Sequence, residues 1–157
     1  MSDWKADRVG SAERGENPMV VARMKSGFAV IGDTQLLPGY CVLLAYPKVK
    51  DLRALPWQRR SRFLLDMSLI GDAIQTACNP ARINYSIYGN TEQFLHAHVF
   101  PWYEWEPAER QPYPVWQHPA EMWRDAQHAY SDTAHRSLRE KISAALRSRT
   151  LALTTQA

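Results

Sequence analysis

Cysteine is scarce in this chain of 157 residues, which has only Cys41 and Cys78. The two lie far apart among apolar neighbours, and no Cys-x-x-Cys pair occurs. Thiolate metal sites and disulfide frameworks both need closer or more numerous cysteines, so neither is indicated. Two buried free thiols in a reducing cytoplasm are the expected state, and a single disulfide is the alternative.

Long apolar runs and a strong charge excess are also missing. No run approaches the roughly 18 apolar residues that a membrane span needs, and "MSDWKADRVG" lacks the apolar centre of a signal peptide. Nineteen basic and sixteen acidic residues give a net charge of +3, without a basic stripe carrying interleaved aromatics. This balance suits an anionic ligand but does not indicate nucleic acid. We expect a cytoplasmic protein with neither a membrane nor a nucleic-acid partner.

The length fits one domain, and no internal repeat or long linker interrupts it. Residues 1–18 are polar and read as an irregular arm, with room for one helical turn. The central part, 19–103, carries the strand and helix patterns. Residues 104–157 form a tail that is rich in proline and tryptophan, and we expect its tryptophans to shape the substrate pocket.

Hydrophobic periodicity predicts the elements of this domain. A stripe of Phe63, Met67, Ile70, Ile74 and Ala77 predicts a helix that follows Pro56 and stops at Asn79-Pro80. A final helix is expected over 132–147. Short runs rich in β-branched residues predict strands over 19–24, 28–33, 40–47, 82–89 and 94–101. The order predicts an α+β fold, an antiparallel sheet of about five strands with a central helix on one face and a C-terminal helix.

The last predicted strand, "FLHAHVFP" (94–101), carries two of the five histidines. Because side chains alternate along a strand, His96 and His98 share one face, with Cα atoms roughly 6.5 Å apart. The small and medium apolar residues between them suit the packed side of the sheet. The two imidazoles therefore project together.

Three interpretations of this pair compete. Both rings could be structural and satisfied by local hydrogen bonds. A His-x-His pair could also bind zinc or iron, but that requires a third ligand, and Glu92 and the histidines of the tail give no recognisable ligand spacing. The third interpretation is an anion site with a nucleophilic imidazole.

The pattern resembles the signature of the histidine triad superfamily, His-φ-His-φ-His-φ-φ with φ hydrophobic, most closely that of bacterial diadenosine-tetraphosphate-hydrolase-like members. With Pro101 as the anchor, His96 and His98 match the second and third histidines. "YGNT" resembles the phosphate loop of the family, and "FAVIGDTQLLPGYCVLL" resembles its strand–loop–strand segment. The resemblance covers about residues 20–103.

The resemblance implies roles for individual residues. His96 would attack the α-phosphorus of a nucleotide to give a nucleotidyl-histidine, since a neutral imidazole is a good nucleophile near pH 7. Donors must be in place for the developing negative charge. The phosphate-binding residues would be His98, Gly89, Asn90 and Thr91, and the nucleoside-binding residues Asp33, Phe28 and Ile31.

Three positions depart from the resemblance. Phe94 stands in place of the first histidine, Trp102 in place of the arginine that often follows the proline, and Tyr40 in place of a histidine after Pro-Gly. The loss of the arginine removes a fixed positive charge where a polyphosphate could run. These departures raise the alternative of an altered substrate or of a protein that binds without catalysis.

The predicted function is hydrolysis of a dinucleoside polyphosphate or a nucleoside phosphoramidate. A nucleotide-binding protein without efficient catalysis is one alternative, and a nucleotidyltransferase or phosphorylase is the other. No metal is assigned to the protein itself, although a divalent cation such as Mg²⁺ would accompany a polyphosphate. The resemblance also implies a homodimer through the central helix and the adjoining strand, with Arg14 and Asn17 able to reach a partner's site.

Overall fold

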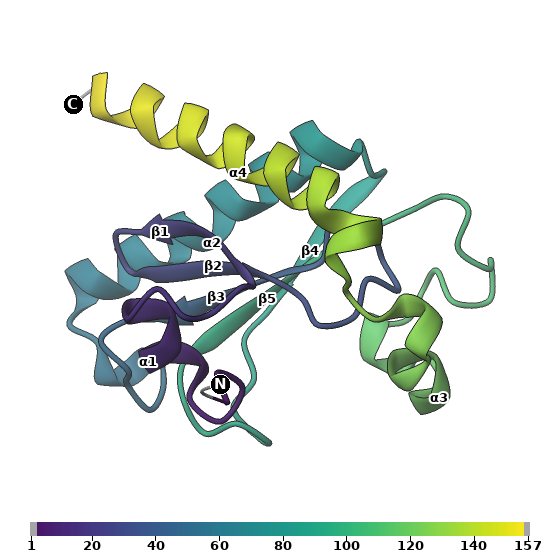
Figure 1. The fold of residues 1–157 in the computed structure, drawn as a ribbon, viewed down its shortest axis with the longest axis horizontal. Helices are drawn as coiled ribbons and strands as arrows, with labels where there is room; N and C mark the ends of the chain where they lie inside the picture. Colours follow the sequence, from purple (N-terminus) through teal and green to yellow (C-terminus); the bar gives the residue numbers. More distant parts are fainter. Residues whose placement is uncertain (1–2, 156–157) are drawn as a thin grey trace.

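The computed structural model describes residues 3–155 and shows one sheet with helices packed around it (Figure 1). The five strands are β1 (Val20–Met24), β2 (Gly27–Ile31), β3 (Cys41–Ala45), β4 (Arg82–Ser86) and β5 (His96–Trp102). They lie in the order β1-β2-β3-β5-β4, and every neighbouring pair is antiparallel. The predicted α+β fold with a five-stranded antiparallel sheet is confirmed.

The long helix α2 (Trp57–Cys78) covers one face of the sheet. Pro56 caps its start, and Asn79 ends it in the left-handed conformation that asparagine tolerates, as the sequence predicts. Phe63, Ile70 and Ile74 of the predicted stripe are fully buried. They face β-strand residues that are buried as completely, among them Leu43, Ala97 and Val99.

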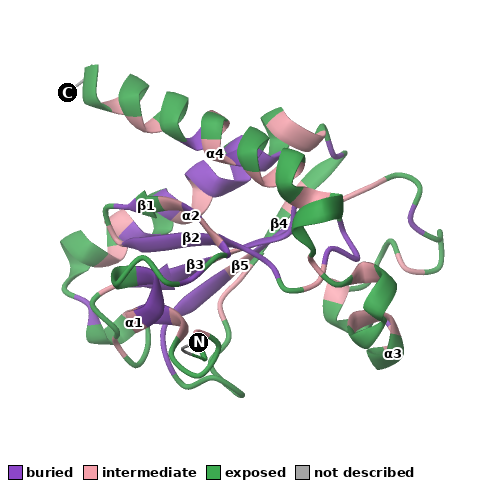
Figure 2. Cartoon of the chain, viewed as in Figure 1, coloured by how far each residue is buried: buried purple, intermediate pink, exposed green. Residues whose placement is uncertain are grey.

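Helix α4 (Asp132–Thr155) crosses α2, packs against it and contacts β1 (Figure 1). It buries Ile142 and Leu146 in the same core, while most of its outward surface is exposed (Figure 2). The helix begins where the sequence predicts but continues eight residues beyond Arg147. Thr150, Thr154 and Thr155 hydrogen bond to carbonyls of the preceding turn, and these bonds accompany the extension.

The strand boundaries differ from expectation at β5. The strand continues through Pro101 to Trp102, although proline was expected to end it. Pairing with β3 stops at Val99, so at Pro101 only β4 lies alongside. A proline without an N–H is tolerated at such an edge position.

The remaining elements are short and lie outside the sheet. The arm contains α1 (Arg8–Glu13), capped by the Asp7 side chain, which is more than the single turn expected. The tail contains α3 (Ala120–Arg124) and 3₁₀ turns at Val115–Gln117 and Ala126–His128. Another 3₁₀ turn, Leu52–Ala54, lies between β3 and α2. The arm and the part of the tail before α4 approach the sheet face that α2 leaves uncovered.

Candidate functional site

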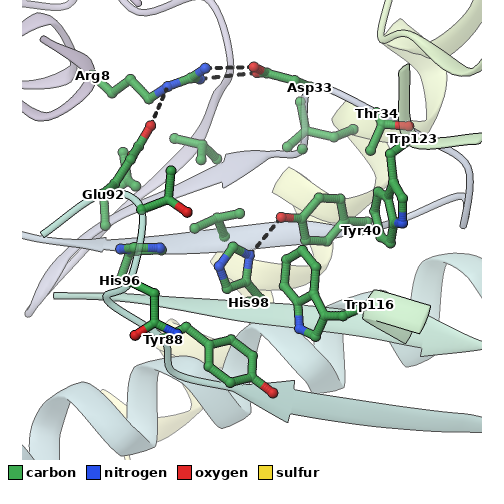
Figure 3. A pocket seen from close by; sticks show the side chains of 17 residues that line it. Arg8, Asp33, Thr34, Tyr40, Tyr88, Glu92, His96, His98, Trp116 and Trp123 are labelled. Carbon is green, nitrogen blue, oxygen red and sulfur yellow. Dashed lines mark hydrogen bonds and ion pairs between the residues drawn. The ribbon is translucent and has the colours of Figure 1, made fainter. Parts of the chain in front are cut away.

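A cavity of about 640 Å³ lies against the face of the sheet opposite α2 (Figure 3). Its floor consists of residues that share one face of neighbouring strands, because Val42 pairs with His98 and Leu44 pairs with His96. The volume is within the range of small-molecule sites. Both histidines line the cavity, as the alternation of β5 predicts.

His96 is held in one tautomer by the backbone. Its Nδ1 lies 2.7 Å from the carbonyl oxygen of Phe94, two residues earlier. A carbonyl can only accept, so Nδ1 carries the proton and donates it. In the neutral ring, the lone pair is therefore on Nε2. The ring is 8% exposed and lines the cavity, so its unprotonated nitrogen is available to a bound ligand.

His98 is held by a side chain instead. The Tyr40 hydroxyl lies 2.7 Å from its Nδ1. Burial raises the pKa of Tyr40 far above its usual range, so the hydroxyl keeps its proton. Burial and the neighbouring His96 lower the pKa of His98 to about 4, so this ring is neutral near pH 7. We assign the hydroxyl as donor to Nδ1, which leaves the His98 proton on Nε2.

The two rings lie 4.9 Å apart between centroids, at an interplanar angle of 78°. One presents a nitrogen lone pair and the other an N–H, within a single cavity. A nitrogen lone pair can attack an electrophile, and an N–H can donate a hydrogen bond to a developing oxyanion. Tyr40, a departure from the resemblance, thus has a defined contact with the site.

The predicted phosphate loop is only partly brought to the cavity. Asn90 and Thr91 line it, and both are exposed and so open to a ligand. Gly89 is not among the lining residues, and no other atoms lie within 4 Å of where its Cβ would be. The open space around Gly89 leaves its backbone accessible beside the other two residues.

Asp33 lines the cavity but already has a partner. Its two carboxylate oxygens accept hydrogen bonds from Arg8 at 3.1 and 2.6 Å. The Nε atom of Arg8 also lies 4.0 Å from a carboxylate oxygen of Glu92. These three side chains lie together at one end of the cavity (Figure 3). Sequence reasoning did not find Arg8, because an irregular arm gives no pattern that places its residues.

The other two predicted nucleoside-binding residues have different positions. Ile31 lines the cavity. Phe28 does not: it is on the same face of β2 as Val30, but its ring packs against Tyr46 and beneath the Arg23 guanidinium. Phe28 shares its face with Val30, which lines the cavity, so its position along the strand and not its face keeps it out of the cavity.

Aromatic side chains form the other end of the cavity. Trp116 meets the His98 ring edge to face at 4.8 Å and stacks on Trp123 at 5.4 Å. Tyr88 meets Trp116 at 5.8 Å. The tail tryptophans expected to shape the pocket are therefore Trp116 and Trp123.

A buried polar pair lies behind this aromatic end. His118 and Glu106 approach to 3.4 Å, and Glu106 also accepts from the Tyr103 backbone N–H. His118 contacts the Trp123 ring at 6.5 Å between centroids. The tail is thus anchored by polar contacts as well as by ring stacking.

The other two departures lie around the site. Phe94 lies two residues before β5, where its ring contacts His96 at 4.9 Å between centroids and its carbonyl orients that histidine. Trp102 is outside the cavity, in a neighbouring groove that Arg82 also lines. Neither position supplies a charge to the histidine pair.

Three further findings concern residues 3–155 as a whole. Within this range, no three His, Cys, Asp or Glu side chains converge in a set that could hold a metal ion. None of the helices in the same range is long and apolar enough to cross a membrane. Both cysteines are free thiols, Cys41 buried and Cys78 partly so.

Comparison with models of known protein families gives no match, and comparison with curated proteins gives none either. Solved structures do match. A histidine triad protein from Sinorhizobium meliloti superposes with a TM-score of 0.67 at 19% identity, covering 90% of this chain and 93% of that one. One from Marinobacter aquaeolei has the same score and identity, covering 82% and 88%.

A third match is a hypothetical histidine triad nucleotide-binding protein from Sulfolobus tokodaii. It has a TM-score of 0.67 at 12% identity, covering 89% of this chain and 91% of that one. Such low identities carry no residue roles, but the shared path of the chain extends over nearly the whole of each protein. This chain therefore has the fold of the histidine triad proteins.

Proposed function

We propose that this protein is a nucleotide hydrolase in which His96 is the nucleophile. The observation that carries the proposal is the hydrogen bond from His96 Nδ1 to the Phe94 carbonyl, which leaves Nε2 unprotonated in the neutral ring. The fold shared with histidine triad proteins supports it, and one of those proteins is named as nucleotide-binding.

In the first step, Nε2 of His96 forms a bond to the α-phosphorus, and the bond from phosphorus to the leaving group breaks. The leaving group departs with the electron pair, as a phosphate anion from a polyphosphate, or as an amine whose nitrogen has taken a proton from solvent in a phosphoramidate. The imidazole then carries a positive charge, which the Phe94 carbonyl stabilises through Nδ1–H. A water molecule next attacks phosphorus, the phosphorus–nitrogen bond breaks, and a proton passes to solvent. The products are a nucleoside monophosphate and the restored histidine.

His98 is proposed to act as a hydrogen-bond donor and not as a general acid. Its neutral ring has one proton on Nε2, because Nδ1 accepts from Tyr40. Loss of that proton would leave an imidazolate in a buried site, which is energetically unfavourable. His98 Nε2–H, together with Asn90 and Thr91 and the backbone near Gly89, would stabilise the phosphoryl oxygens.

The nucleoside is proposed to bind along Ile31 and Asp33. A carboxylate can accept hydrogen bonds from both ribose hydroxyls, but Arg8 donates to both Asp33 oxygens. A ribose must therefore share Asp33 with Arg8 or displace it. Phe28 is left out of the proposed nucleoside site, because it does not line the cavity.

Replacement of His96 tests the proposal. His96→Ala should lower turnover of a nucleoside phosphoramidate and of a dinucleoside polyphosphate at least about a thousandfold, since the other imidazole of the cavity, His98, is assigned an N–H and not a lone pair toward the ligand. His135→Ala, on α4 and away from the cavity, is the matched control and should retain activity. Hydrolysis by His96→Ala at the parental rate would contradict the assignment.

A nucleotide-binding protein without efficient catalysis is the second candidate. It is favoured by the absence of a histidine at Phe94 and of a cation at Trp102. Nucleotide binding without any covalent intermediate on His96 would support it. A transferase would use the same first step, and product analysis with phosphate present would distinguish it from a hydrolase.

The homodimer also remains a proposal. Strand β4 lies at the edge of the sheet, and Leu64 and Leu65 of α2 are 38% and 40% exposed, which supports an interface there. Asn17 does not favour the expected reach into a partner's site, because its buried side chain bonds to Arg8 and Met19 of its own chain. Sedimentation analysis tests the assembly, and the mass of a single chain would contradict it. The cytoplasmic location likewise stays a prediction.

A further inference from the structure

The charges that line the cavity are unusual for a site that would hold several phosphates. Among the described lining residues, Arg8 is the only arginine or lysine, while Asp33 and Glu92 are both carboxylates. Arg8 is already engaged by these same two carboxylates. With His98 neutral, the fixed charges of the lining give an excess of one negative charge.

A chain of phosphates attached at the histidine pair could extend in two directions. Toward one end it meets Glu92 and the Arg8–Asp33 pair, and toward the other it meets Tyr88, Trp116 and Trp123 (Figure 3). The first direction offers a cation that is already paired, and the second offers rings and no charge. Trp102, where the resemblance has an arginine, lies outside the cavity. Neither direction compensates additional phosphoryl charges.

Glu92 is the lining residue whose charge opposes additional phosphates most directly. Its side chain is 52% exposed, and its contact with Arg8 is the longest of the three that Arg8 makes with carboxylates. It follows Asn90 and Thr91 in the same loop, so its charge lies next to the proposed phosphate site. A carboxylate there repels each added phosphate charge.

We propose that Glu92 is a specificity-determining residue that restricts the site to nucleoside monophosphate derivatives, which carry one phosphoryl group, and disfavours dinucleoside polyphosphates. The proposal rests on the proposed function and selects between its two substrate classes. Arg8 acts in the opposite direction, because it compensates part of the negative charge of the two carboxylates.

The test compares adenosine 5′-phosphoramidate with diadenosine tetraphosphate as substrates, in EDTA so that no divalent cation shields the phosphates. The parent should have the higher kcat/KM for the phosphoramidate. Glu92→Gln should raise kcat/KM for the tetraphosphate about tenfold and that for the phosphoramidate by much less. Arg8→Ala should lower kcat/KM for the tetraphosphate below the parental value. Both changes should shrink at high salt.

Glu140→Gln is the matched control, since Glu140 is exposed on α4 and does not line the cavity. It should leave the ratio of the two substrates unchanged. Equal use of both substrates by the parent, or an unchanged ratio in Glu92→Gln, would overturn the proposal while leaving the hydrolase function intact.

Binding provides a readout that does not depend on turnover. Calorimetry with AMP, ADP and ATP should show affinity falling along this series in the parent, and the fall should be shallower in Glu92→Gln. If neither substrate is hydrolysed but the binding series behaves as expected, the proposed function fails and the charge selection stands. If affinity rises with phosphate number in the parent, the charge selection fails.

Discussion

The two sides of the cavity have different origins. The floor comes from β3, from β5 and from Tyr40 directly before β3. Strand pairing and two hydrogen bonds of 2.7 Å hold His96, His98 and Tyr40 in place. The surrounding walls come from the arm, from the tail and from the loop before β5, which contribute Arg8, Trp116 and Glu92. The floor carries the chemistry of the proposed reaction, and the walls carry its selectivity.

If this division holds, changes in the floor should act on kcat and changes in the walls on KM. Tyr40→Phe should give the larger effect. It removes the donor that fixes the tautomer of His98, so part of the population would have its proton on Nδ1 and none to offer the substrate. We expect kcat to fall about tenfold with little change in KM, measured by steady-state kinetics on the phosphoramidate.

Tyr113→Phe is the control for this change, because Tyr113 is 57% exposed and does not line the histidine cavity. Its kinetics should match those of the parent. A Tyr40→Phe variant with parental kcat would show that the hydroxyl only fills space beside His98, and that the floor is less finely arranged than the contacts indicate.

Trp116→Ala should give a smaller and different effect. The indole covers one edge of His98, so its loss should open the aromatic end to water. We expect KM to rise about threefold to fivefold, with a smaller change in kcat. NMR titration should also show the pKa of His98 moving up from about 4, because burial is the main cause of its depression.

Trp57→Ala is the comparison for this variant, since Trp57 is 69% exposed at the start of α2. It should leave both KM and the His98 titration unchanged. A Trp116→Ala variant that lowers kcat alone would place the indole with the reacting groups and would break the division between floor and walls.

The smallest expected effect concerns stability. The pKa of His98 is lower in the folded protein, at about 4, than its ordinary value of 6.5, so between these values the unfolded chain binds more protons. Stability should therefore fall as pH drops through that window. The contribution is on the order of 2 kcal/mol after allowance for partial exposure. The free energy of unfolding, measured by urea denaturation near both ends of this pH window, should depend less on pH in His98→Gln than in the parent. The same pH dependence in both proteins would contradict the lowered pKa of His98.

The floor could be predicted from the sequence to a large extent. Alternation along 94–101 placed His96 and His98 on one face, and the apolar residues between them on the packed face, because a strand allows only that arrangement. The stripe in 57–78 predicted the helix that covers the other face. The bond from Tyr40 to His98 could not be predicted, since it depends on the register of β3 against β5.

The walls could be predicted much less. Arg8 reaches Asp33 through tertiary contacts of the arm, and no periodic pattern marks it. Several tryptophans in one region indicated an aromatic wall, but tertiary contacts determine which of them line the cavity: Trp116 stacks on Trp123 and meets Tyr88 edge to face. The position of Pro101 inside β5 could not be predicted either, because it depends on where β3 stops pairing with β5.

The most direct test of the central claim is detection of the covalent intermediate. The protein should be mixed with adenosine 5′-phosphoramidate, quenched rapidly and digested, and the adduct located by mass spectrometry. The account predicts an adenylyl group on His96, with a phosphorus–nitrogen linkage that is labile to acid, and none on the His96→Ala variant. Hydrolysis with an adenylyl group on another residue, or turnover without any adduct under conditions that slow its breakdown, would contradict it.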